Sequence, residues 1–361
     1  MRILTALTAL WATTLALPST NPPPSISLNS RQGGALGSKP TSFEWQSTGP
    51  LVSAKNDGRG IAGIKDPSIV LINGTYHVFA STAQSSGYNL VYFSFKDFAQ
   101  AGNAKFHYLD QAPLGTGYRA APQVFYFTPH KTWYLIYQNG NAAYSTNKNI
   151  SDPLGWTAPQ VFYPAGRPKI IDDNIGAGYW VDMWVICDDK DCHLFSSDDN
   201  GQLYRSQTTL ANFPNGMSQP VIALQDKKND LFEASCVYTW GDGFADGTKY
   251  LLLVEAIDPD GNRWFRSWTS ASISGPWKGL ANTMENPFAR WNNVKFPDDK
   301  VWTWSISHGE LVRTDTDEKL RIDPCSMDFL YQGIGPDADW SDYNALPWKL
   351  GLITLRNSVC G

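Results

Sequence analysis

Short runs of β-branched and aromatic residues, each interrupted by a turn, repeat along most of this chain. Examples are D-P-S-I-V-L-I-N-G-T-Y-H-V-F-A-S from Asp66, A-P-Q-V-F-Y-F-T-P-H-K-T-W-Y-L-I-Y-Q from Ala121 and V-D-M-W-V-I-C-D-D-K-D-C-H-L-F-S-S from Val181. Each unit is typical of two strands joined by a tight turn. Because helical periodicity is rare, the pattern predicts an all-β protein built from hairpins.

The spacing of these units indicates a repeat architecture. Five of them begin at Asp66, Ala121, Asp182, Glu233 and His308, roughly 50 to 75 residues apart. Propeller blades repeat about every 40 to 50 residues, and added loops account for the difference. The spacing therefore predicts a five-bladed β-propeller, whose innermost strands converge on one axis. A β-sandwich with scattered acidic residues is the alternative.

Three of the five unit starts carry a carboxylate in an apolar or aromatic setting. They are Asp66 in I-K-D-P-S-I-V, Asp182 in Y-W-V-D-M-W-V and Glu233 in L-F-E-A-S-C-V-Y. Removing a carboxylate from water costs free energy, so three of them at equivalent positions are expected to share one polar cavity. A single such residue would more often cap a turn or pair with an arginine. Together they predict a site of acid and base chemistry.

Composition and charge narrow the class of partner. The 15 Trp, 16 Tyr and 17 Phe make the chain 13% aromatic, and only 17% of residues are charged. Aromatic rings suit stacking on the apolar faces of sugar rings, although a Trp-rich β core explains the same numbers. The net charge of -5, without a Lys/Arg run, lacks the footprint of a nucleic-acid or anionic-membrane binder. We therefore expect a neutral polymer as partner.

The N-terminal sequence predicts export. Residues 1–17 have a basic start, a short apolar stretch and small residues near the end, as in a secretory signal. The Pro-, Ser- and Gly-rich segment 18–40 is expected to be a disordered leader, and 41–361 to form the propeller. Asn73-Gly74-Thr75 and Asn149-Ile150-Ser151 match the glycan acceptor pattern, the first at an expected hairpin tip. We expect a secreted, extracellular monomer.

Five cysteines in a secreted chain leave at least one unpaired. Cys187 and Cys192 flank D-D-K-D between two apolar runs, so we predict a disulfide across that hairpin end. Cys325 and Cys360 could tie the C-terminus to the last strands. Cys236, three residues after Glu233, is predicted to be the free thiol and to serve packing rather than nucleophilic chemistry.

At these residues the chain closely resembles the α-L-arabinofuranosidases of glycoside hydrolase family 62, secreted fungal enzymes that debranch arabinoxylan. The resemblance covers about 41 to 358. Its segments include F-E-W-Q-S-T-G-P-L-V-S, G-I-K-D-P-S-I-V, G-Y-R-A-A-P-Q-V-F-Y-F, G-Y-W-V-D-M-W-V-I-C, F-S-S-D-D-N-G-Q-L-Y-R-S, D-L-F-E-A-S, I-S-H-G-E and D-Y-N-A-L-P-W. The resemblance implies a five-bladed propeller and an inverting mechanism with arabinoxylan as substrate.

The resemblance also implies roles for the three carboxylates. Asp66 matches the family's general base, Glu233 its general acid, and Asp182 the carboxylate that tunes and orients the acid. An inverting glycosidase needs one ionised carboxylate and one protonated carboxylic acid, which agrees with these roles. Lys65 would favour an ionised Asp66 if a bulge places both side chains on one face. Asp182 would raise the pKa of a nearby Glu233 by like-charge repulsion.

Further residues are implied as binding groups. Tyr343 and Asn344 match segments at the mouth of the arabinose pocket, and Arg119 and Gln123 lie in another such segment. We count Lys65 with them as substrate-binding. His308 resembles a histidine at the propeller axis that holds a calcium ion together with waters, so a structural calcium is expected there. No redox or nucleotide cofactor is expected.

The chain departs from the family pattern in two places, and two other functions stay open. Cys236 stands where a polar residue, often Asn, is usual, and the N-terminal cysteine that many relatives pair with the position of Cys325 is absent. A relative from family 43 acting on arabinan or xylosides would share the propeller and a similar acid trio. A non-catalytic sugar-binding propeller is the other alternative, but it would be expected to lack one of the three carboxylates.

Overall fold

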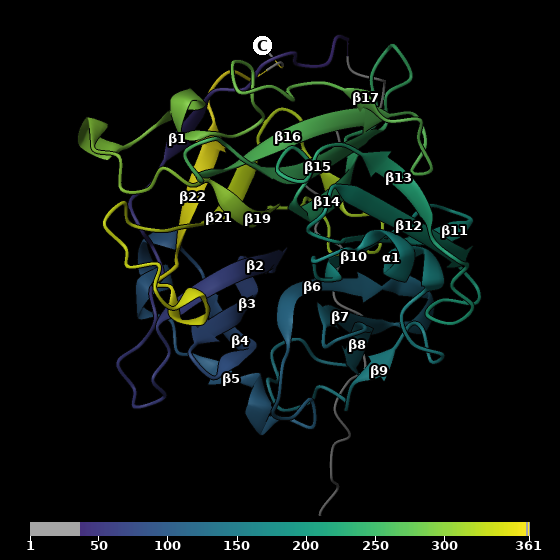
Figure 1. The fold of residues 1–361 in the computed structure, drawn as a ribbon, viewed down its shortest axis with the longest axis horizontal. Helices are drawn as coiled ribbons and strands as arrows, with labels where there is room; N and C mark the ends of the chain where they lie inside the picture. Colours follow the sequence, from purple (N-terminus) through teal and green to yellow (C-terminus); the bar gives the residue numbers. More distant parts are fainter. Residues whose placement is uncertain (1–36, 359, 361) are drawn as a thin grey trace, which may run out of the picture. The chain divides into compact units, whose positions relative to one another are not determined.

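The computed structural model describes residues 37–358 and 360 of the chain. The predicted signal segment and residues 18–36 of the predicted leader lie outside this part. The described strands form five sheets of four or five strands each. Figure 1 shows these sheets as blades of one ring, with β2, β6, β10, β14 and β19 facing its centre. The prediction of a five-bladed β-propeller is confirmed.

Each of the first three blades is an antiparallel sheet whose strands follow one another from the axis outward. Blade 1 contains β2 (Gly63–Ile72), β3 (Thr75–Gln84), β4 (Gly87–Phe95) and β5 (His107–Tyr108). Blade 2 contains β6 (Ala120–Phe127), β7 (Thr132–Gln138), β8 (Ala142–Asn147) and β9 (Gln160–Val161). Blade 3 contains β10 (Val181–Cys187), β11 (Asp191–Ser197), β12 (Gln202–Thr209) and β13 (Val221–Gln225).

The last two blades each have a fifth strand. Blade 4 contains β14 (Glu233–Trp240), β15 (Tyr250–Ile257), β16 (Arg263–Ser270) and β17 (Lys278–Gly279), and β20 (Arg321–Ile322) pairs with β14 in parallel. Blade 5 contains β19 (Ser307–Leu311), β21 (Asp328–Gly333), β22 (Lys349–Leu355), β1 (Trp45–Ser47) and β18 (Val294–Lys295). The N-terminal strand β1 thus closes the ring by pairing with the C-terminal strand β22.

Helical structure is limited to short segments. The α-helix α1 (Lys169–Asn174) precedes blade 3. The 3-10 turns are η1 (Phe98–Asn103), η2 (Leu109–Gln111), η3 (Thr128–His130), η4 (Trp291–Asn293), η5 (Pro297–Asp299) and η6 (Tyr343–Ala345). None of the helices in residues 37–358 is long and apolar enough to cross a membrane.

Aromatic side chains fill the spaces between neighbouring blades. Trp184 of blade 3 meets Tyr238 of blade 4 edge to face, with ring centroids 5.4 Å apart. Phe265 of blade 4 meets Phe329 of blade 5 in the same way at 5.2 Å. Such pairs contribute about 0.5–1.5 kcal/mol each beyond the area that they bury. Many of the aromatic residues therefore belong to the hydrophobic core. A Trp-rich β core was the alternative explanation of the aromatic composition.

A β-bulge at the start of each innermost strand is the feature that builds the site. The register shifts between Lys65 and Ser68 in β2, and at the equivalent places in β6, β10, β14 and β19. In four of the strands one bulge residue has a positive φ: 50° at Asp66, 50° at Ala121, 56° at Asp182 and 56° at Ala234. A bulge interrupts strict alternation, so adjacent side chains can face the same side.

Side chains from elsewhere in the ring hold these bulges. The backbone N–H of Asp66 donates to Gln332 Oε1 of blade 5 at 2.6 Å, and that of Asp182 donates to Gln138 Oε1 of blade 2 at 2.7 Å. The same contact occurs from Ala121 to Ser81, from Ala234 to Asp182 and from His308 to Glu255. Each acceptor belongs to the preceding blade, so the five strand starts are fixed relative to one another.

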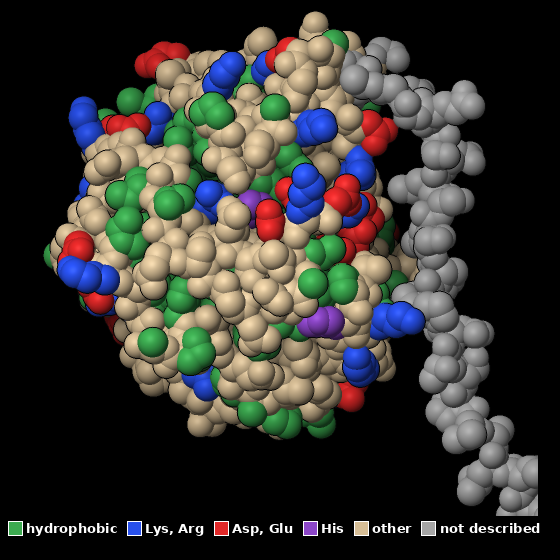
Figure 2. All heavy atoms as spheres, turned by 90° about the vertical axis from the view of Figure 1, so that its right-hand side faces the viewer, with side chains coloured by type: hydrophobic (Ala, Val, Ile, Leu, Met, Phe, Trp, Pro, Cys, Tyr) green, Lys and Arg blue, Asp and Glu red, His purple; other side chains and the backbone are tan. Residues whose placement is uncertain are grey.

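Two features of the surface bear on the sequence predictions. Asn73 lies exposed in the turn between β2 and β3, as expected of a hairpin tip. Lys39, near the end of the predicted leader, forms an ion pair with Asp246 of blade 4. On the face drawn in Figure 2, acidic and basic side chains are intermingled.

Candidate active site

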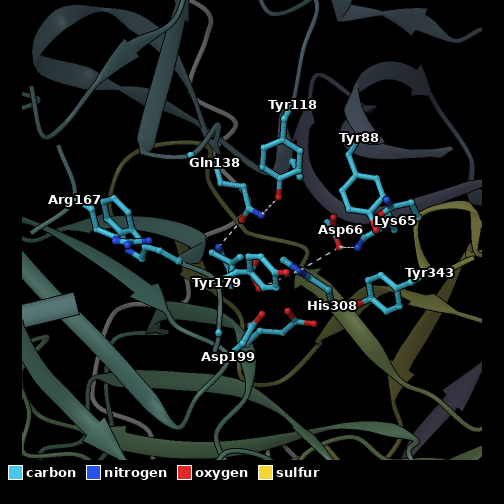
Figure 3. Close-up of a pocket in the computed structure, with 18 residues that line it drawn as sticks. Lys65, Asp66, Tyr88, Tyr118, Gln138, Arg167, Tyr179, Asp199, His308 and Tyr343 are labelled. Carbon is cyan, nitrogen blue, oxygen red and sulfur yellow. Dashed lines mark hydrogen bonds and ion pairs between the residues drawn. The ribbon is translucent and has the colours of Figure 1, made fainter. Parts of the chain in front are cut away.

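A pocket of about 510 Å³ opens at the end of the axis where the innermost strands begin. Its lining includes Asp66, Asp182, Glu233 and His308, so blades 1, 3, 4 and 5 all contribute a chemical group (Figure 3). The rim carries exposed tyrosines: Tyr118 is 42% exposed, Tyr179 73% and Tyr343 46%. The interior of the pocket is therefore acidic, and its mouth is aromatic.

Asp66 sits beside positively charged and polar neighbours. Its Oδ1 lies 3.6 Å from Lys65 Nζ and 3.4 Å from His308 Nδ1. Lys65 Nζ also lies 4.6 Å from the centroid of the Tyr88 ring. Burial alone would lower the pKa of Lys65, but the charge of Asp66, reinforced by Tyr343, Tyr88 and Glu233, raises it. Lys65 is therefore a permanent cation next to the Asp66 carboxylate, on the same side of the bulge, as the sequence analysis anticipated.

Asp182 is buried between two other carboxylates. Its Oδ2 accepts a hydrogen bond from the Ala234 backbone at 2.6 Å and lies 3.7 Å from His308 Nδ1. Burial, and then the negative charges of Glu233 and Asp66, raise the pKa of Asp182 well above its usual value. The sequence analysis predicted that repulsion from Asp182 raises the pKa of Glu233; the structure shows the charge of Glu233 raising the pKa of Asp182, and the effect on Glu233 stays a prediction.

Glu233 is held by an arginine that sequence reasoning did not single out. Arg263 Nη1 donates to Glu233 Oε1 at 2.9 Å and to Glu255 Oε1 at 2.8 Å. The Glu233 side chain is 21% exposed, against 5% for Asp66 and 7% for Asp182. Glu233 is thus the most accessible of the three carboxylates from the mouth of the pocket.

Arg263 also binds a second, buried carboxylate, that of Glu255. Glu255 is fully buried, and its Oε2 accepts hydrogen bonds from Ser307 Oγ at 2.8 Å and from the backbone of His308 at 2.7 Å. Burial raises the pKa of Glu255 to about 7, although Arg263 opposes the effect. Glu255 therefore connects the residue that holds Glu233 with the strand that carries His308.

Asp199 is a fourth carboxylate in the pocket, and it too was missed. It lies in the turn between β11 and β12, within the segment S-S-D-D-N-G. Figure 3 shows it on the side of the pocket opposite Tyr118 and Gln138. A turn of this composition usually signals only local structure, so the sequence analysis quoted this segment as part of the family resemblance without singling out its second aspartate.

Comparison with known proteins agrees with this arrangement. The family model described as "Glycosyl hydrolase family 62" matches residues 44–354. The chain belongs to glycosyl hydrolase family 62. An α-L-arabinofuranosidase from Podospora anserina, solved in complex with cellotriose, is 71% identical, with 89% of this chain and 99% of that chain covered and a TM-score of 0.86.

Two further relatives agree with the family assignment. The catalytic domain of a family 62 α-L-arabinofuranosidase from Coprinopsis cinerea is 63% identical, with coverage of 89% and 100% and a TM-score of 0.86. α-L-Arabinofuranosidase C of Cellvibrio japonicus is 46% identical over 319 residues, which are 87% of this chain and 47% of that protein. The chain thus spans about half the length of that relative.

Seven of the nine site residues named from the sequence line the pocket of this family 62 protein. They are Lys65, Asp66, Asp182, Glu233, His308, Tyr343 and Asn344. The other two lie outside the lining. Arg119 donates to the backbone carbonyls of Tyr118 and Leu114, and Tyr118 faces the pocket in its place. Gln123 is buried and exchanges two hydrogen bonds with the backbone of Val185 in blade 3. The structure thus places Arg119 and Gln123 outside the pocket lining, and their role in substrate binding stays a prediction.

The residues around His308 can be compared with the ligands that a calcium ion needs. The described residues contain no group of three or more His, Cys, Asp or Glu side chains placed to hold a metal ion. His308 Nδ1 faces the carboxylates of Asp66 and Asp182, and Ca²⁺ prefers six to eight oxygen ligands. The side chains of residues 37–358 do not build such a cage by themselves, and the calcium stays a prediction.

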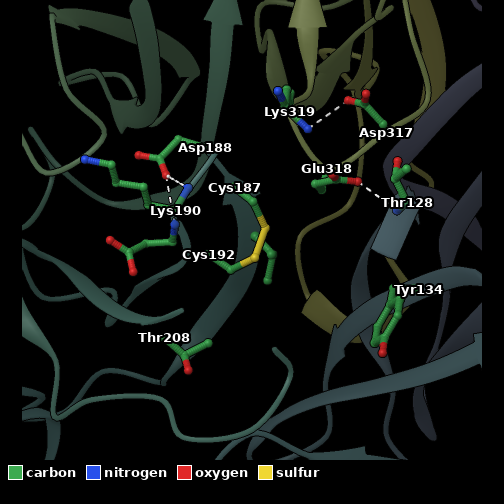
Figure 4. Close-up of a disulfide and its surroundings, with 12 residues drawn as sticks. Thr128, Tyr134, Cys187, Asp188, Lys190, Cys192, Thr208, Asp317, Glu318 and Lys319 are labelled. Atoms are coloured by element: carbon green, nitrogen blue, oxygen red, sulfur yellow. Dashed lines mark hydrogen bonds between the residues drawn. A yellow bond between two sulfur atoms is a disulfide. The ribbon is translucent and has the colours of Figure 1, made fainter. Parts of the chain in front are cut away.

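The described cysteines form two disulfides and leave one free thiol, as predicted. Cys187 and Cys192 form a disulfide across the end of the β10–β11 hairpin (Figure 4), and Cys325 pairs with Cys360. Cys236 is free and buried, and its Sγ donates to the Gly309 carbonyl at 3.4 Å. Burial raises the pKa of this thiol well above its usual value, which suits packing and not nucleophilic chemistry.

Proposed function

We propose that this chain is a secreted, inverting α-L-arabinofuranosidase that removes arabinofuranosyl side chains from arabinoxylan. One observation carries the proposal: Asp66 and Glu233 enter one pocket from blades 1 and 4 with different neighbours. Asp66 is buried beside the Lys65 cation, whereas Glu233 is more accessible and contacts Arg263. Two carboxylates in different environments are what acid and base roles require.

Asp66 fits the role of general base. Its Oδ1 lies 3.6 Å from Lys65 Nζ, and the carboxylate can take a proton from water as that water attacks the anomeric carbon. The backbone hydrogen bond to Gln332 and the bulge hold the carboxylate in place before substrate arrives. Holding the base in position in this way reduces the entropy cost of bringing water and sugar together.

Glu233 fits the role of general acid. Of the three predicted carboxylates it is the most accessible from the mouth, where the leaving xylose oxygen would lie. As the C–O bond breaks, the electron pair goes to that oxygen and Glu233 supplies its proton. Arg263 fixes the direction of the carboxyl group, and Asp182 is the neighbouring buried carboxyl group that tunes and orients the acid.

The rim of the pocket supports a polymeric substrate. Tyr118, Tyr179 and Tyr343 are exposed around the mouth, where their rings can stack on sugars that stay outside. Relatives that are 46% to 71% identical are named α-L-arabinofuranosidases. The two disulfides support secretion, because disulfides persist in oxidising compartments. We also keep glycosylation at Asn73 and Asn149 and a monomeric state as predictions.

The stereochemical course tests the mechanism. In an inverting enzyme the two carboxyl groups lie about 6.5–9.5 Å apart, with room for water. Proton NMR during hydrolysis of an α-linked substrate is expected to show β-arabinofuranose first. If the α-anomer appears first, the enzyme retains configuration and Asp66 is not a general base.

The released product tests the substrate. Arabinose released from wheat arabinoxylan, with the xylan main chain left uncut, is the expected result. Faster release from linear arabinan, or release of xylose, would favour an activity like that of family 43. Binding of xylan without any hydrolysis would indicate a carbohydrate-binding propeller.

A further inference from the structure

The loop that precedes β6 carries Tyr118 and is held by hydrogen bonds from its neighbours. Arg119 Nη1 donates to the Tyr118 carbonyl at 2.7 Å, and the backbone of Arg119 donates to the Tyr88 carbonyl at 3.1 Å. Asn89 Nδ2 donates to the Gly117 carbonyl at 2.8 Å. The Tyr118 ring lies beside the Tyr88 ring, with the two centroids 6.1 Å apart. These contacts fix the direction of the Tyr118 side chain before substrate binds.

The Tyr118 side chain extends from the mouth of the pocket towards its interior. The residue as a whole is 42% exposed, but its hydroxyl accepts a hydrogen bond from Nε2 of Gln138. Gln138 is buried and lines the same pocket. Figure 3 shows the Tyr118 ring with its hydroxyl turned towards Gln138. The hydroxyl therefore lies beside a buried pocket residue, where a sugar that enters the pocket would contact it.

The orientation of the Gln138 amide determines how the Tyr118 hydroxyl is used. A backbone N–H can only donate, so the N–H of Asp182 must face the amide oxygen, Gln138 Oε1, at 2.7 Å. The amide nitrogen therefore faces the Tyr118 hydroxyl, and because this nitrogen only donates, the hydroxyl oxygen accepts. The hydroxyl proton is not used in this contact and has no acceptor elsewhere in residues 37–358. A tyrosine hydroxyl keeps its proton up to about pH 10, so at neutral pH it is a free donor.

A free donor in this position needs an acceptor in the ligand. An arabinofuranosyl group carries hydroxyl groups on C2, C3 and C5, and each of these oxygens can accept a hydrogen bond. We propose that Tyr118 is a specificity-determining residue whose hydroxyl donates a hydrogen bond to one hydroxyl oxygen of the arabinofuranosyl group in the pocket. The inference rests on the proposed function, because it takes the ligand to be an arabinofuranosyl group.

The contact also places the sugar relative to the carboxylates. Gln138 holds the backbone N–H of Asp182 through its amide oxygen and the Tyr118 hydroxyl through its amide nitrogen. The donor is thus fixed with respect to the bulge that carries Asp182, so a sugar bound to Tyr118 has a defined position in the acidic interior. A sugar without an oxygen at the matching position leaves the donor unpaired, and the site discriminates against it.

The test compares kcat/KM for wild type, Tyr118→Phe and Tyr134→Phe on nitrophenyl α-L-arabinofuranoside and on three derivatives that lack the hydroxyl on C2, C3 or C5. Tyr118→Phe keeps the ring and removes only the hydroxyl. Tyr134→Phe is the matched control, because it removes a hydroxyl that contacts His130 and does not line the pocket. A hydrogen bond between neutral groups is worth about a factor of five, so we expect Tyr118→Phe to lower kcat/KM on the parent substrate about fivefold. Tyr134→Phe is expected to stay within about twofold of wild type.

The deoxy substrates show whether the loss comes from a hydrogen bond. On one of them the ratio of wild type to Tyr118→Phe should fall to about one, because the partner of the hydroxyl is missing; the intrinsic reactivity of each substrate cancels in this ratio. Equal ratios on the parent and all three derivatives would overturn the proposal, as would a Tyr118→Phe protein that matches wild type on the parent. A loss on arabinoxylan alone would place the contact on the xylan main chain and would also overturn it. Failure of the proposed function is seen in wild type itself, as the absence of arabinose among the products of arabinoxylan.

Discussion

Replacing Glu255 with glutamine should change how the stability of this propeller depends on pH. Glu255 is fully buried, and its pKa rises from 4.5 to about 7. A carboxyl group with a raised folded-state pKa is most stabilising below the unfolded-state pKa, and that stability is lost as pH rises towards the folded-state value. Wild-type stability should therefore fall between about pH 4.5 and pH 7 through this residue.

The magnitude follows from the difference between the two pKa values. Each pKa unit corresponds to about 1.4 kcal/mol, so ionising Glu255 in the folded protein costs about 3 kcal/mol by pH 7. A glutamine at this position would not ionise, and its amide oxygen could still accept from Arg263, Ser307 or the backbone of His308. We expect Glu255→Gln to gain up to about 3 kcal/mol on wild type between pH 4.5 and pH 7.

The assay is urea unfolding followed by tryptophan fluorescence at several pH values from about 4.5 to 8, on wild type and Glu255→Gln. The informative quantity is the difference in unfolding free energy between the two proteins, because other titrating groups largely cancel in it. A difference that rises with pH through this window supports the reasoning. A difference that stays constant would show that Glu255 is not the titrating group.

Three further predictions address the site and the sulfurs. Glu233→Gln and Asp66→Asn should each lower hydrolysis of arabinoxylan by roughly 100-fold or more at an unchanged melting temperature, because each removes a proton-transfer group; more than a tenth of wild-type turnover would argue against the role. One thiol should react with a thiol reagent in denaturant and none in the native protein, since Cys236 is the free, buried cysteine; a bridged Cys236 in non-reducing peptide maps would contradict this. If calcium binds near His308, a chelator should lower the melting temperature more than the activity at moderate temperature; an unchanged melting temperature would leave His308 as a residue of the carboxylate cluster alone.

The sequence by itself determined the strands, their grouping into hairpins and the positions of three carboxylates. These are local properties: alternation of apolar residues, turn residues such as Asn73-Gly74, and an acidic residue at a strand start can be read in a window of about ten residues. The disulfide between Cys187 and Cys192 is also local, since the two residues face each other across one hairpin.

Only the tertiary structure decided which polar residues face the pocket. Arg263 lies in the third strand of blade 4 and Asp199 in a turn of blade 3. Arg263 contacts Glu233 and Asp199 lines the same pocket because of how the blades are placed around the axis. Conversely, Gln123 is the residue at which the strand register resumes after the bulge of β6, yet its side chain joins two blades and does not line the pocket. The direction of each side chain depends on a bulge and on contacts with the preceding blade, which join residues far apart in the chain. Such contacts leave no local pattern in the sequence. The sequence could therefore predict the three carboxylates, whereas the residues that contact them follow only from the tertiary structure.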